Sequence, residues 1–260
     1  MYLVFDIGRT HTRIAVSGDG ENLDKVEIID TSTDFPQALS SFKQLTTQLS
    51  SGQKITAAAV GVRRLNHPTI PLWSGENLKE SLEKLLNTTV YLENDAALAG
   101  LGEAIYGAGK GKKIVAFLTV STGIGGARIV DGKIDQNIMG FEPGNQIISQ
   151  DPIGYLEGLV SGNAIEKRFG KKGEFISDPK IWEEMAKLLA IGLNNTIVHW
   201  SPEIVVLGGS VMKSIPLEKV KINLNEVLKI YPQPPEIVKA SLGDKAGLLG
   251  GLILLKQLTL

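Results

Sequence analysis

The chain has 260 residues, a net charge of −1, 21% charged residues and no cysteine. Disulfides and thiolate metal sites are therefore excluded, and the balanced charge gives no basic surface of the kind that binds nucleic acid. The N-terminus has no signal-like segment, and no apolar run is long enough to span a membrane. We therefore expect a cytoplasmic protein of one large or two small domains.

The first part of the chain alternates between short apolar runs and segments of helical spacing, as expected of an α/β protein. Strands are predicted at residues 2–5, 13–17, 55–62 and 89–92, and helices at residues 36–49, 78–86 and 96–106. A hairpin turn is predicted at residues 18–20, and a loop broken by two prolines at residues 63–75.

The second part repeats this alternation. Strands are predicted at residues 114–120, 126–130, 203–207 and 237–240, and helices at residues 181–200 and 246–258. The Gly- and Lys-rich stretch 107–113 is the candidate hinge, which gives domains 1–107 and 108–245, with a closing helix at about 246–260 that returns to the first domain. The segments 4–16 and 116–130 both predict a strand, a Gly/Thr turn and a strand, which suggests an internal repeat.

Two Gly/Thr-rich turns are candidate phosphate sites. The turn that contains Asp6, Gly8 and Thr10 offers backbone N–H groups and hydroxyls to phosphate oxygens, and Asp6 could hold Mg²⁺ through water. A β-turn capped by Asp and Thr explains the same residues. The second turn, at 121–126, contains a GxGG sequence but precedes a predicted strand, so it fails the context of a dinucleotide fingerprint. Phosphate binding and a simple tight hairpin both remain open there.

Several polar residues near predicted strand ends and turns are candidate ligands for substrate. Asn94 and Asp95 end a strand before a helix, so Asp95 could accept a hydroxyl proton or could only cap the helix. Glu142 and Glu157 lie near turns and could take paired sugar hydroxyls, or could be solvated surface residues. Gly208–Gly209 could let the backbone approach a flat ligand such as adenine, or could serve a simple turn.

In combination these stretches resemble the ROK family of sugar kinases, repressors and open reading frames, within the actin, hexokinase and Hsp70 ATPase superfamily. The resemblance covers nearly the whole chain, and its strongest segments are ENDAALAGLGEAIYGAGKG, LTVSTGIGGARIVDGKI, EPGN, GYLEGLVSGNAI, PEIVVLGGSV and LGDKAGLLGG. It implies an α/β fold of two ribonuclease H-like domains around a central cleft. It also implies transfer of the γ-phosphoryl group of ATP to a hexose hydroxyl.

The resemblance also assigns roles to residues. Asp95 matches the catalytic base, which is weak at an ordinary pKa of about 3.9 but sufficient where positioning and charge neutralisation dominate. The matches to sugar-binding positions are Asn94, Glu142, Asn145 and Glu157. The matches to ATP-binding positions are Asp6, Gly8, Arg9, Thr10, Thr122, Gly123, Gly208 and Gly209. The expected partners are ATP, Mg²⁺, a sugar (glucose or an N-acetylhexosamine) and a second copy of the chain.

The sequence departs from the family pattern in three places. Arg9 stands where the family usually has a second glycine, and it could grip a phosphate or obstruct the nucleotide. The loop at 61–65 lacks a Pro-Gly turn that touches the sugar in family kinases. The four positions of the family's zinc ligands hold residues without thiolate or imidazole groups, so no structural zinc is predicted; they are Asn145, Ile148, Gln150 and Tyr155.

Three alternatives to a kinase remain. The first is a non-catalytic sugar-binding or regulatory family member, which Arg9 and the altered loop would favour. A DNA-binding repressor is less expected, because such members carry a helix-turn-helix domain ahead of the first strand. An ATPase that acts as a structural module fits the fold but not the ENDA, EPGN and YLEG segments.

Overall fold

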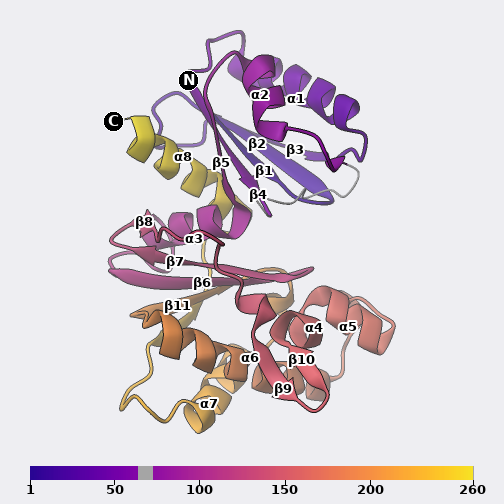
Figure 1. Ribbon diagram of the computed structural model, residues 1–260, viewed down its shortest axis with the longest axis vertical. Coiled ribbons are helices and arrows are strands. Elements are labelled where there is room, and N and C mark those ends of the chain that lie inside the picture. Colours follow the sequence, from indigo (N-terminus) through magenta and orange to yellow (C-terminus); the bar gives the residue numbers. More distant parts are fainter. Residues whose placement is uncertain (64–72, 260) are drawn as a thin grey trace. The chain divides into compact units, whose positions relative to one another are not determined.

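The structure is a computed structural model that describes residues 1–63 and 73–259 (Figure 1). Most of the predicted loop at 63–75 therefore lies outside the described residues. The chain divides into two compact units, Met1–Gly102 with Asp244–Leu260, and Glu103–Gly243. None of the helices in the described part is long and apolar enough to cross a membrane.

The first unit contains a five-stranded mixed sheet in the order β3-β2-β1-β4-β5. Its strands are β1 (Tyr2–Ile7), β2 (His11–Ser17), β3 (Lys25–Asp30), β4 (Ala57–Val62) and β5 (Val90–Asn94). Strands β1, β4 and β5 are parallel, whereas β2 is antiparallel to both β1 and β3. The four strands predicted in this part are confirmed with small shifts at their ends, and β3 is an addition that the sequence analysis missed.

Helices cover both faces of this sheet, with α1 (Phe35–Ser50) and α2 (Leu78–Leu86) on one face and α8 (Ala246–Thr259) on the other (Figure 1). The alternation of side chains along β1 explains the two layers. Phe5 packs on Phe42 of α1, with ring centroids 5.4 Å apart, whereas Val4 joins Leu248 and Leu252 of α8 in a separate apolar cluster.

The second unit has the sheet order β12-β11-β6-β7-β8. Its strands are β6 (Ile114–Val120), β7 (Ile124–Val130), β8 (Lys133–Ile134), β11 (Ile204–Gly208) and β12 (Glu236–Lys239). Strands β6, β11 and β12 are parallel, and β7 is antiparallel to β6 and β8. Strand for strand this is the topology of the first unit, so the structure confirms the predicted repeat.

Long helix α6 (Pro179–Trp200) and α7 (Leu217–Val227) contribute to the core of the second unit, where Leu189 and Leu193 join Leu118 and Val205 of the sheet. Helices α4 (Leu156–Val160) and α5 (Gly162–Phe169) and a two-stranded hairpin, β9 (Ile147–Gln150) with β10 (Ile153–Tyr155), complete the unit. The sequence analysis predicted α6 but not α4, α5, α7 or the β9–β10 hairpin. The remaining helix, α3 (Asp95–Ile105), begins in the first unit and ends in the second.

Candidate active site

Acidic residues meet at one edge of the first sheet. Strands β1, β4 and β5 are parallel, and the register places Asp6 beside Gly61 and Gly61 beside Glu93. Asp95 follows two residues later, at the start of α3. A Cβ atom on Gly61 would lie 3.5 Å from Cα of Asp95 and 3.2 Å from the Leu98 side chain. Gly61 on β4 therefore lies beside both Asp6 and the start of α3.

The two aspartates of this edge influence one another. The pKa of Asp6 is raised from 3.8 to about 6, chiefly by burial and next by the charge of Asp95. Arg13 opposes this rise, because its Nη1 lies 3.6 Å from Oδ2 of Asp6. Its Nη2 also donates to Oδ1 of Asp244 at 2.9 Å. No sequence pattern singles out Arg13 or Asp244, which are 231 residues apart and meet only in the fold.

Asn94 has a structural task at this edge. Its Oδ1 accepts a hydrogen bond from the Ala97 N–H at 3.0 Å, and its Nδ2 donates to the Arg63 carbonyl at 2.7 Å. The first bond is a helix N-cap, so the capping function considered for Asp95 belongs to Asn94. The Asp95 carboxylate accepts from the adjacent Ala96 N–H at 2.7 Å. Burial raises the pKa of the neighbouring Glu93.

The first Gly/Thr turn, between β1 and β2, is tight. The Gly8 N–H donates to the His11 carbonyl at 3.0 Å, and a Cβ atom on Gly8 would lie only 2.8 Å from that oxygen. From outside the turn, Thr31 donates its hydroxyl to the Gly8 carbonyl and its N–H to the Thr10 carbonyl, both at 2.8 Å. Arg9 and Thr10 are exposed, so their side chains are open to solvent while these hydrogen bonds hold the backbone of the turn in place.

The second Gly/Thr turn lies between β6 and β7, where the Ser121 N–H donates to the Gly123 carbonyl at 2.9 Å. The start of α5 supports it, because the Gly162 N–H donates to the Ser121 carbonyl at 2.7 Å and the Asn163 N–H to the Thr122 carbonyl at 3.2 Å. The strand that follows the turn agrees with the rejection of a dinucleotide fingerprint, which opens a helix.

The Gly208–Gly209 turn packs against the strand that leads into this second turn. Gly209 has φ +96°, and a Cβ atom there would overlap the backbone of Val120. A Cβ atom on Gly208 would lie 3.1 Å from the Phe117 ring. The residues predicted to bind adenosine and those predicted to bind phosphate are therefore neighbours in the second unit.

Three predicted sugar-binding residues also gather in the second unit. Glu157 accepts the Ile124 N–H at 2.6 Å. A Cβ atom on Gly144 would lie 2.5 Å from the Ile124 carbonyl oxygen and 3.1 Å from Cβ of Glu157. On either side of Gly144, Asn145 donates its Nδ2 to Oε2 of Glu142 at 3.2 Å. Glu157 is half-buried and bonded to the backbone, so it is not a solvated surface residue.

The residues at the family's zinc positions do not fit a zinc site. Asn145, Ile148, Gln150 and Tyr155 supply no thiolate, imidazole or carboxylate. Ile148 instead packs against the apolar core of the second unit, on the β9–β10 hairpin. Within residues 1–63 and 73–259, no group of three or more His, Asp or Glu side chains could hold a metal ion.

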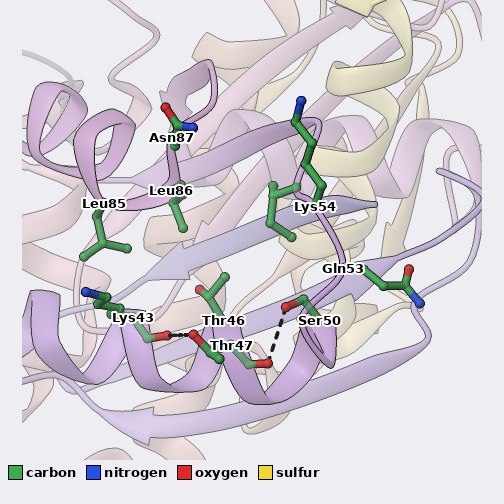
Figure 2. Close-up of a pocket in the computed structure, with 11 residues that line it drawn as sticks. Lys43, Thr46, Thr47, Ser50, Gln53, Lys54, Leu85, Leu86 and Asn87 are labelled. Carbon is green, nitrogen blue, oxygen red and sulfur yellow. Dashed lines mark hydrogen bonds between the residues drawn. The ribbon is translucent and has the colours of Figure 1, made fainter.

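A surface hollow of about 340 Å³ lies apart from these residues, between α1 and the end of α2 (Figure 2). Lys43, Lys54 and Leu86 help to line it, and the buried hydroxyl of Thr46 has no hydrogen-bond partner among the described residues. Ile55, also in its lining, precedes β4, so the hollow lies at the opposite end of that strand from Gly61. None of the predicted site residues contributes to it.

The two mixed sheets share one topology, and in each a Gly/Thr turn follows the central strand. These features define an α/β protein of two ribonuclease H-like domains. The chain belongs to the ROK family, which it matches over residues 2–258.

Relatives in this family include kinases for sugars. An uncharacterized protein from Clostridium perfringens is 34% identical over 56% of this chain, but the match spans only 55% of that relative. The fructokinase of Zymomonas mobilis is 31% identical over 71% of this chain and 68% of its own length. The N-acetyl-D-glucosamine kinase of Vibrio atlanticus is 27% identical over 98% of this chain and 99% of its own.

Solved structures share the fold. A ROK family glucokinase from Streptomyces griseus, in complex with glucose and AMPPNP, superimposes with a TM-score of 0.82 at 23% identity, over 98% of this chain and 99% of that one. The ROK hexokinase of Thermus thermophilus gives 0.79 at 24% identity, over 99% of each chain. At these identities the likeness concerns the fold.

Proposed function

We propose that this protein is an ATP-dependent sugar kinase that transfers the γ-phosphoryl group of ATP to a hydroxyl of a hexose, either glucose or an N-acetylhexosamine. The observation that carries the proposal is the proximity of Asp6 and Asp95 at one edge of the first sheet, where the charge of Asp95 raises the pKa of Asp6. Of two carboxylates at the ends of neighbouring strands, one can act as the proton acceptor and the other can bind a cation in the same reaction.

Asp95 is the proposed general base. The Ala96 N–H donates to its carboxylate, which orients that group. During transfer the sugar oxygen forms a bond to the γ-phosphorus, the bond to ADP breaks, and the hydroxyl proton passes to Asp95. A weak base is sufficient because phosphoryl transfer depends mostly on positioning and charge neutralisation.

Nucleotide-binding residues are proposed in each of the two units. In the first unit the residues are Asp6, Gly8, Arg9 and Thr10, and in the second they are Thr122, Gly123, Gly208 and Gly209. Both turns are tight and rich in backbone N–H groups, which suit phosphate oxygens. Asp6 would hold Mg²⁺ through water, and the ion would neutralise charge on the phosphates.

The proposed sugar site consists of Asn94 in the first unit and Glu142, Asn145 and Glu157 in the second. The packing of Glu157 and the Glu142–Asn145 turn around Gly144 supports the second group. The relatives that act on fructose and N-acetylglucosamine, and the glucose-bound neighbour, support a hexose. A homodimer, a cytoplasmic location and the absence of structural zinc stay predictions; one zinc per chain by elemental analysis would contradict the last of these.

The test is ADP release from ATP·Mg²⁺ with glucose, mannose, fructose, allose, N-acetylglucosamine and N-acetylmannosamine, each with the wild-type protein and with Asp95→Asn. We expect sugar-dependent release that Asp95→Asn abolishes. Sugar binding by calorimetry without ADP release would contradict the kinase and favour the regulatory family member. ATP hydrolysis that ignores every sugar would favour an ATPase module.

A further inference from the structure

Glu103, on α3, is a buried carboxylate that the proposed reaction does not use. Its side chain is 0% exposed and forms no ion pair with any cation of the described residues. It accepts hydrogen bonds from the N–H groups of Ala108 at 2.9 Å, Ser241 at 2.9 Å and Leu242 at 2.8 Å. The Ser241 hydroxyl lies 3.2 Å from Oε2. Neutral donors therefore offset the burial of this carboxylate.

These donors, like Glu103 itself, belong to the second unit, and they lie near the points where the chain enters and leaves it. The chain enters the second unit after Gly102 and leaves it at Gly243. We call residues 103–109, just after the chain enters the second unit, the outgoing connection, and residues 240–243, just before it leaves, the returning connection. Ala108 lies on the first, whereas Ser241 and Leu242 lie on the second, up to 139 residues away from Glu103 in the chain. One carboxylate thus joins the outgoing connection to the returning one.

The outgoing connection is wrapped closely around Glu103. The backbone carbonyl of Glu103 accepts the N–H groups of Gly107 at 3.1 Å and Gly109 at 2.9 Å, so three successive amides donate to one residue. A Cβ atom on Gly107 would overlap the Glu103 carboxylate. The Gly-rich stretch 107–113 is the candidate hinge in the sequence, but in the structure its first residues form a turn that is hydrogen-bonded to Glu103.

The returning connection is also held from the other side. Asp244, the first residue back in the first unit, accepts a hydrogen bond from Arg13 at 2.9 Å. Between this anchor and Leu242 lies only Gly243, which has φ +55° and at which an added Cβ atom would meet nothing within 4 Å. Glycine adopts such a backbone with less strain than residues that carry a Cβ atom, so Gly243 is the candidate for rotation between these two anchors.

We propose that Glu103 is a positioning residue that fastens the two connections together, and that Gly243 is the pivot of the returning one. The proposal extends the proposed function, on which its kinetic test rests, because the proposed site residues Asp95 and Glu157 belong to the two units that these connections join. Loss of the Glu103 brace would leave both connections free to move independently.

The direct test measures amide hydrogen exchange in the full chain, without sugar or ATP, for peptides that cover residues 104–112 and 238–244. Ser241→Ala removes only the hydroxyl contact, and Glu103→Gln replaces one acceptor oxygen with a donor. We expect Glu103→Gln to speed exchange in both peptides together by roughly tenfold or more, as expected when a buried N–H loses its acceptor. Ser241→Ala should do so more weakly, including at Ala108 on the other connection.

Glu203→Gln is the matched control, because Glu203 accepts a single, exposed N–H from Lys113 at 2.7 Å. It should leave the 238–244 peptide unchanged. Faster exchange of residues 104–112 alone in Glu103→Gln would overturn the proposal and reduce Glu103 to a cap for the end of α3. If Glu103→Gln does not fold, the Ser241→Ala variant still tests the proposal, because an unchanged exchange rate of the Ala108 amide would overturn it.

The pivot has a separate readout in sugar-dependent ADP release. Gly243→Ala and its control Gly170→Ala both place alanine at positive φ, +55° and +68°, with no atom within 4 Å of the added carbon. We expect Gly243→Ala alone to change kcat and KM together, as hinge substitutions do. Equal kcat and KM values for the two variants would overturn the proposal that Gly243 is the pivot. If no sugar is turned over, the proposed function fails, while the exchange test of Glu103 still stands.

Discussion

The Asn94 side chain accepts a hydrogen bond from the Ala97 N–H at 3.0 Å, which makes Asn94 the N-cap of α3. Asp95 next to it accepts the Ala96 N–H and lies near Asp6, whose pKa its charge raises. Asn94 therefore has a structural task beside its proposed sugar contact, whereas Asp95 has the proposed task of a general base, and substitution can separate the helix cap from the base.

Asp95→Asn should abolish phosphoryl transfer while changing the melting temperature little, because the asparagine oxygen can still accept the Ala96 N–H. Asn94→Ala should instead lower the free energy of unfolding by about 1 kcal/mol through loss of the cap, or a few degrees of melting temperature. ADP release and thermal unfolding of both variants check this. A large melting shift in Asp95→Asn would show that Asp95 is structural.

Asp6 predicts a pH-dependent stability. Its folded pKa of about 6 lies above the ordinary 3.8, so between these values the folded chain keeps a proton that the unfolded chain has lost. Ionisation of Asp6 therefore lowers the free energy of unfolding by at most about 3 kcal/mol. The full loss is present above pH 6, and none of it is present below pH 3.8. Asp6→Asn should stabilise the protein at pH 8 and have no such effect near pH 3.8.

The same Asp6→Asn variant should lose activity at every pH, since the proposed Mg²⁺ site needs a carboxylate. Urea unfolding at the two pH values checks the stability, with Glu27→Gln on the exposed face of β3 as the control that should show no pH-dependent gain. Equal stabilisation of Asp6→Asn at both pH values would contradict the raised pKa.

Elements with a clear apolar period were predictable, and strand β3 was not. All six residues of β4 are buried, so an apolar run marks it, and the long apolar face of α6 gives a clear helical period. Strand β3 has five exposed residues of six and is a strand because it pairs with β2. Its pattern KVEIID carries little signal without that partner.

The site was predictable where short motifs carry it, and less so where distant segments meet. A glutamate on a helical pattern predicts a solvated side chain, whereas Glu103 is buried and accepts hydrogen bonds from the distant residues Ser241 and Leu242. Arg13 and Asp244 are likewise paired only by the fold. The cap was assigned one residue too late because the end of β5 at Asn94 fixes where α3 begins.

Glu157 combines a structural bond with a proposed sugar contact, and Glu157→Gln separates them. The Gln oxygen can still accept the Ile124 N–H, so the fold should be retained. A charged acceptor for sugar hydroxyls is lost, so KM for the sugar should rise roughly tenfold or more, with KM for ATP nearly unchanged. Glu166→Gln, an exposed residue of α5, is the control. A lower melting temperature with unchanged sugar KM would leave Glu157 only its bond to the turn.

Gly209 should tolerate no side chain. Its backbone has φ +96°, and a Cβ atom there would overlap Val120, just before the turn Ser121–Gly123. Gly209→Ala therefore combines backbone strain with overpacking and should destabilise the protein by roughly 2–5 kcal/mol.

Because Val120 leads directly into the turn Ser121–Gly123, its displacement in Gly209→Ala should also raise KM for ATP more than KM for the sugar. Gly170→Ala shares the positive φ, +68°, but its added carbon meets nothing within 4 Å, so it should cost only about 1–2 kcal/mol and leave both KM values unchanged. Thermal unfolding and steady-state kinetics compare the two. If Gly209→Ala behaves like Gly170→Ala, the close packing of the Gly208–Gly209 turn on β6 is not needed for the nucleotide site.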